Sequence, residues 1–200
     1  MTPVASVDLY WIPLGAGASV VRASGAIFEA LMASARHRPR CQLYHSALVV
    51  THETDTYTIE MTPEPDDRGR LDRGVVAGGA VGTAAAARFR TFRYEIRCWP
   101  GGVIPDLGDA VASPVRLSTD PDDAARIVTL APRVPTPVWG RDELHTGEMW
   151  NSNSVTSWLL ARTGLATAGC EPPPGGRAPG WNAGLVASRF GAPAEAERAS

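Results

Sequence analysis

Residues 41–62, CQLYHSALVVTHETDTYTIEMT, decide the fold of this chain. The two runs 41–51 and 57–62 are rich in β-branched and aromatic residues, and the polar residues 52–55 separate them. Strand-like runs on either side of a short polar segment are typical of a β-hairpin. The sequence therefore predicts two antiparallel strands joined by a four-residue loop.

The register of this hairpin decides which side chains share a face of the sheet. With residues 52–55 as the loop, Glu60 lies opposite Ala47, on the same face as His45 and diagonal to it. The Cα atoms of such diagonal neighbours are about 7–8 Å apart, so the carboxylate of Glu60 can reach and orient the imidazole of His45. A register shift of one residue would move Glu60 to the other face.

The rest of the chain shows strand and helix signals on both sides of the hairpin. Periodicity and capping residues predict, in chain order, a strand over Val7–Leu14, an amphipathic helix over Ser19–Ala35, a strand over Phe89–Trp99, a helix over Asp122–Leu130 and a helix from Asn151 to Gly164. We expect one α+β domain over residues 1–190, with a mainly antiparallel sheet packed against helices, and a disordered tail at 191–200.

Composition excludes several classes of function. The chain has 200 residues and is 44% hydrophobic and 20% charged, a composition that predicts a globular domain. Its formal charge is -2, and it lacks the basic stripe that nucleic-acid binding requires. All 19 basic residues are arginine, so a catalytic lysine is excluded. Cys41, Cys98 and Cys170 lack C-x-x-C spacing, which argues against disulfides and zinc.

The same reading predicts where the protein acts and what it binds. We expect a cytoplasmic location, because reduced cysteines fit that compartment and neither a targeting segment nor an apolar run of transmembrane length is visible. No ligand spacing indicates a metal, and no cofactor is expected. The expected partner is a small molecule, a lipid or a peptide.

Residues 151–154, Asn-Ser-Asn-Ser, open the last predicted helix and are the second place where chemistry is expected. The positive end of a helix dipole favours an anionic nucleophile or a developing oxyanion. Ser152 would still need a base, and His45 is the plausible one. The alternative is that Asn151 or Ser152 only caps the helix, since Ser and Asn are preferred caps on any helix.

The segments YHSALVV, YTIEMTP and WNSNSVTSWLL together resemble the circularly permuted papain-like (NlpC-like) superfamily, which includes lecithin:retinol acyltransferase-like and PPPDE-type proteins. This resemblance implies a permuted papain-like fold with His45 as general base and Glu60 as the orienting polar residue. It aligns Asn151 and Ser152 with the Asn-Cys pair of the family. Serine therefore stands where the family has its cysteine nucleophile.

Four further residues are expected to bind substrate, because they lie beside Ser152 or just before its helix. Asn151, Asn153 and Trp150 flank the serine, and His145 lies in the polar stretch before the helix. Aromatic residues beside such a site suit an apolar acyl or peptide group.

Two functions follow from these residues. The first is a hydrolase or acyltransferase that acts on an amide or ester bond through Ser152, His45 and Glu60. The second is a catalytically inactive papain-like binding module that kept the fold and lost the thiol.

Overall fold

The computed structural model describes residues 5–14, 41–64, 74–104, 106–167 and 169–190. The helix predicted over residues 19–35 and the tail predicted at 191–200 lie outside the described residues.

The described residues form an α+β fold with a mainly antiparallel sheet, as predicted. The strands are β1 (Ser6–Pro13), β2 (Gln42–His52), β3 (Asp55–Pro63), β4 (Val75–Ala80), β5 (Arg93–Pro100), β6 (Val115–Ser118) and β7 (Gly176–Arg177). The α-helices are α2 (Pro121–Leu130), α3 (Ser152–Thr163) and α4 (Trp181–Ala187). Short 3-10 turns lie at Ala84–Arg88, Arg90–Phe92, Leu107–Asp109 and Ala131–Arg133.

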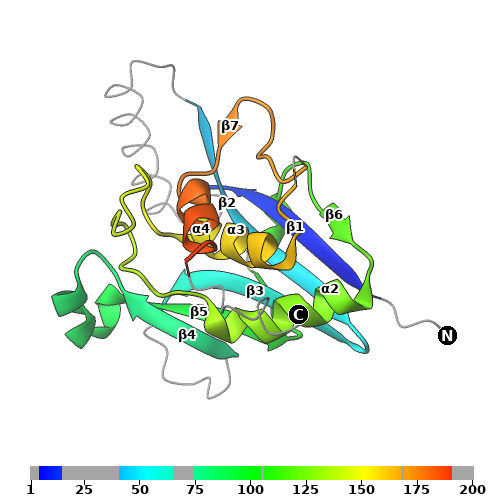
Figure 1. Ribbon diagram of the computed structural model, residues 1–200, viewed down its shortest axis with the longest axis horizontal. Coiled ribbons are helices and arrows are strands. Elements are labelled where there is room, and N and C mark those ends of the chain that lie inside the picture. The colour runs from blue at the N-terminus through cyan, green and yellow to red at the C-terminus, as the bar shows by residue number, and fades with distance from the viewer. Residues whose placement is uncertain (1–4, 15–40, 65–73, 105, 168, 191–200) are drawn as a thin grey trace, which may run out of the picture.

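The sheet has the strand order β4-β5-β3-β2-β1-β6, and β7 pairs with β2 in parallel. Figure 1 shows α3 and α4 side by side across the same face of the sheet, with α2 nearby. Most of α3 is buried, including its polar residues Ser154 and Ser157. A helix that is buried on nearly all sides belongs to the core and cannot be amphipathic in the usual sense.

The predicted hairpin is confirmed, with a tighter turn than expected. His52 pairs with Asp55, so only Glu53 and Thr54 form the turn, and Glu53 adopts a left-handed conformation with φ of 56°. The extra pair leaves the register unchanged, because Thr51 still lies opposite Thr56.

Local signals also predicted β1, α2 and α3 to within about one residue. Asp120 caps α2 and Gly164 ends α3 in the left-handed conformation, with φ of 79°, which glycine adopts without strain. The strand predicted over Phe89–Trp99 begins only at Arg93, because 3-10 turns occupy the residues before it. Strands β4 and β6 were not predicted, since a Gly-Gly pair and a four-residue strand give little periodicity.

Each face of the sheet has its own apolar contacts. The main core lies between the sheet and the helices and includes Trp11, Leu48 and Leu159. On the other face, Ile12 and Ala47 pack against Ile104. We call the described residues 101–104 and 106–112 the covering segment. The covering segment thus lies on the face of β2 that odd-numbered residues occupy.

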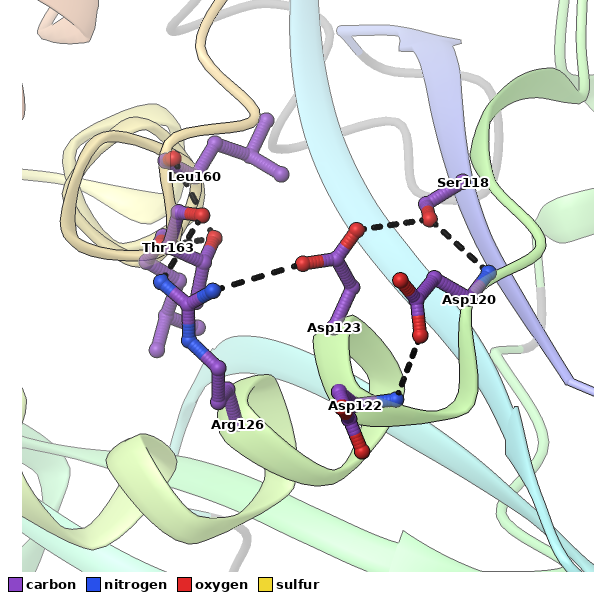
Figure 2. Close-up of polar contacts among 8 residues, drawn as sticks. Ser118, Asp120, Asp122, Asp123, Arg126, Leu160 and Thr163 are labelled. Carbon is purple, nitrogen blue, oxygen red and sulfur yellow. Dashed lines mark hydrogen bonds and ion pairs between the residues drawn. The ribbon is translucent and has the colours of Figure 1, made fainter.

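Helix α2 holds the end of α3 through polar contacts (Figure 2). Arg126 donates to the carbonyl of Thr163 at 3.0 Å and lies 3.5 Å from Asp123, which accepts a hydrogen bond from Ser118 at 2.7 Å. A side-chain donor at the last turn pairs carbonyls that the helix itself leaves open. The helix that carries Ser152 is therefore fixed at its carboxyl end.

Candidate functional site

The sheet opens between β2 and β3 close to His45. Their ladder runs from His52–Asp55 only as far as Leu48–Ile59. Beyond this pair, β3 continues along β5 and β2 continues along β1. The stretch of β2 that carries His45 therefore has no β3 partner on one edge.

Helix α3 occupies this open edge with its first turn. The amide of Asn153 donates to the carbonyl of Tyr44 at 2.9 Å, and its oxygen accepts from Ser46 Oγ at 2.8 Å. Thr156 Oγ1 lies 3.5 Å from the carbonyl of Ser46. Because Leu43 directs its carbonyl to β1, the carbonyls of Tyr44 and Ser46 point to the other edge. The start of α3 thus contacts β2 on both sides of His45.

The imidazole of His45 is held by Asp106. His45 lies opposite Ile12 and on the face of the covering segment, and its Nε2 lies 3.3 Å from Asp106 Oδ2. The side chains of His45 and Asp106 are 27% and 23% exposed, so solvent reaches the pair. The hydrogen bond from His45 lowers the pKa of Asp106 and outweighs the opposing effect of burial.

Glu60 is influenced by the charges of His45 and Asp106, but its ion-pair partner is Arg97. Its carboxylate is 3.6 Å from the guanidinium of Arg97, and both side chains are largely buried. Burial raises the pKa of Glu60, and Arg97 partly offsets this effect. The charge of Asp106 raises the same pKa further and that of His45 lowers it.

The orienting contact expected from Glu60 is therefore supplied by Asp106. The hairpin register is the predicted one, but the ladder ends one pair before Glu60, and beyond this point β2 bonds to Asn153 of α3. Asp106 lies 61 residues from His45, in a covering segment without strand or helix periodicity. The sequence contains no local signal that links these two residues.

Ser152 is the first residue of α3 and is 9% exposed. It directly precedes Asn153, whose side chain bonds to the residues on either side of His45. Among the described residues, no hydrogen bond joins Ser152 Oγ to His45. Its backbone N–H likewise has no acceptor in the described part of the chain, whereas Asn151 accepts from the N–H groups of Asn153 and Ser154.

Asn151 and Asn153 have structural partners where substrate binding was predicted. Asn151 caps α3 and donates from its amide to the carbonyl of Pro179 at 2.8 Å. The amide of Asn153 also donates to Pro179, in addition to its bonds to β2. Polar groups that already have good partners gain little by binding a ligand. These asparagines hold α3 in place.

Trp150 and His145, which were predicted to bind substrate, have no described contact with His45 or Ser152. Trp150 is 1% exposed and belongs to the main core, so its ring packs instead of lining a site. His145 is exposed and has a φ of 53°, in a turn where Asp142 accepts from the backbone N–H groups of Thr146 and Gly147. No contact in the described residues joins it to His45 or Ser152.

The described residues contain no group of three or more His, Cys, Asp or Glu side chains that could hold a metal ion. Within the same residues, no helix is long and apolar enough to cross a membrane. Comparisons with protein-family models, with curated proteins and with solved structures found no match.

The His45–Asp106 contact predicts a pH dependence of stability. The pKa of Asp106 is lowered in the folded state, so the unfolded chain binds more protons as the pH falls through and below about 4, the ordinary range of an aspartate. The stabilisation is present above this range and is lost as the pH falls. We expect His45→Ala to raise the pKa of Asp106 and to flatten this acid-side loss of stability.

Carbon-13 NMR titration of the Asp106 carboxyl, together with denaturant unfolding at several pH values, measures both effects. His145→Ala is the matched control, because His145 lies near Asp142 and should leave the Asp106 titration unchanged. An Asp106 titration that is the same with and without His45 would contradict the contact.

Proposed function

We propose that this protein is a hydrolase or acyltransferase that acts on an amide or ester bond, with Ser152 as nucleophile and His45 as general base on a permuted papain-like fold. One observation carries the proposal: the first turn of α3 is bound to β2 on both sides of His45. Nucleophile and base come from segments more than 100 residues apart, and this contact brings those segments together.

Asp106 gives His45 a defined role in this reaction. If Nε2 donates its proton to Asp106, the other ring nitrogen, Nδ1, is the acceptor. Nδ1 takes the proton of Ser152 Oγ as the oxygen attacks the substrate carbonyl carbon. The protonated imidazole then gives this proton to the leaving amine or alcohol, and the acyl group stays on Ser152.

The acyl group then passes to water or to another acceptor, whose proton His45 takes up in turn. The oxyanion that forms in each step would receive a hydrogen bond from the N–H of Ser152, supported by the dipole of α3. The first-turn N–H of Asn153 is already bound to the cap residue and is not available for this purpose.

The second candidate function is an inactive binding module. It is favoured by the lack of a hydrogen bond between Ser152 Oγ and His45 in the described residues, and by the weaker nucleophilicity of serine at a position that suits a thiolate. In this case His45 and Asp106 would contact a ligand without acylating Ser152.

Labelling with a fluorophosphonate probe separates the two functions. We expect the wild-type protein to be labelled at Ser152, with loss of the label in Ser152→Ala and a reduction of roughly a hundredfold or more in the labelling rate of His45→Ala. Ser188→Ala is the control, because Ser188 bonds a carbonyl of its own helix and should not affect labelling. A folded wild-type protein that no acylating probe labels would favour the binding module.

A further inference from the structure

The segment between β4 and β5 projects from the sheet at one end of the molecule (Figure 1). It contains the two 3-10 turns Ala84–Arg88 and Arg90–Phe92, and Arg93, the first residue of β5, follows them. Neither turn contains a buried residue. We call residues 84–93 the projecting tip.

The projecting tip exposes two large aromatic rings. Phe89 is 54% exposed and Phe92 is 46% exposed. The same short segment also exposes Ala84 and Ala85. Large apolar groups that gather on one exposed segment indicate an interaction site more strongly than scattered ones do.

Arginines lie beside these phenylalanines in the sequence. The projecting tip contains Arg88, Arg90 and Arg93 and no acidic residue. Glu64 binds Arg90 at 2.7 Å and lies 3.9 Å from Arg93, while the guanidinium of Arg88 lies 4.8 Å from the centre of the Phe89 ring. Among the described residues, no carboxylate forms an ion pair with Arg88, and its side chain is exposed.

We propose that the projecting tip docks on the surface of a lipid bilayer that contains anionic lipids. Phe89 and Phe92 would enter the region between headgroups and acyl chains, and Arg88 would bind a lipid phosphate. A bilayer accepts a small convex segment without needing a complementary shape. A stable protein interface buries about 800 Å² on each partner and therefore needs a broader surface than one short segment. The proposal does not depend on the reactivity of Ser152.

Co-sedimentation of the full chain with vesicles tests this proposal. We expect binding to vesicles of equal parts phosphatidylglycerol and phosphatidylcholine, weak binding to phosphatidylcholine alone, and release by high salt. The double variant Phe89→Ser and Phe92→Ser should weaken binding at least about tenfold, and Arg88→Gln should weaken it only on anionic vesicles. Unfolding curves of each variant serve to check that substitution at these exposed positions leaves the fold intact.

Phe190→Ser is the matched control, because Phe190 is 68% exposed outside the projecting tip. Its binding should equal that of the wild-type chain. No binding to anionic vesicles, or binding that is equal in the double variant and in Phe190→Ser, would overturn the proposal. Binding to immobilised polyglutamate without binding to vesicles would also overturn it and would indicate an acidic protein partner.

Discussion

Gly184→Ala is expected to destabilise the protein by about 3 kcal/mol, because overpacking against a rigid backbone costs this order of free energy. Gly184 lies on α4 where this helix meets α3. A Cβ atom at this position would come within 3.0 Å of both the carbonyl oxygen of Ser154 and the Oγ of Ser157. The first contact is with the backbone of α3, which cannot move without disturbing the first turn of that helix.

The effect is measured by thermal and denaturant unfolding, where a loss of this size corresponds to a fall in Tm of about 6–12 °C for a chain of this length. Gly108→Ala is the matched control, because Gly108 is exposed and a Cβ atom there meets open space. It should change stability by less than about 0.5 kcal/mol. Equal Tm values for the two variants would show that α3 and α4 are not packed this closely.

Asn153→Ala is expected to cost a similar amount, about 3 kcal/mol, because it leaves buried polar groups without partners. Asn153 is 1% exposed, and its side chain bonds to Tyr44, Ser46 and Pro179. By helix propensity alone, alanine would be the better residue in a helix. A stability that is unchanged or higher would therefore contradict the structural role of Asn153.

The measurement is again Tm and the free energy of unfolding, with fluorophosphonate labelling of Ser152 as a second readout. Both should fall, since Asn153 fixes the position of Ser152 relative to β2. Asn182→Ala is the matched control: Asn182 has the same place in the first turn of α4, and its side chain makes no hydrogen bond in the described residues.

Both variants affect the first turn of α3. The sequence predicted where this helix starts, but it did not predict which residues the first turn contacts. The Asn-Ser-Asn-Ser segment was recognised as a helix start, and its capping by Asn151 is what any such segment favours. The hydrogen-bond partners of the two asparagine side chains do not follow from this local capping signal. The partners of Asn153 include residues more than 100 positions away, so no local pattern could identify them.

Local sequence patterns also could not identify the charged partners of His45 and Glu60. The position of the hairpin loop at residues 52–55 predicted that Glu60 shares a face with His45, and the hairpin register agrees with this. The position of the loop cannot predict where the two strands stop pairing, because the end of the pairing depends on contacts with segments that are distant in sequence. The ladder ends before Glu60, the first turn of α3 bonds to β2, and Arg97 and Asp106 are the partners of Glu60 and His45.

The sequence by itself determined the elements whose signals lie within a few residues: the hairpin and its register, the capped start of α2, and the extent of α3 from Asn151 to Gly164. Periodicity, caps and turn residues act over one or two turns of backbone, so a single segment carries them completely. The tertiary structure decided the opening between β2 and β3, the pairing of His45 with Asp106, and the burial of Trp150. These features join segments that are distant along the chain, and only packing of the whole sheet against α3 and the covering segment brings such segments together.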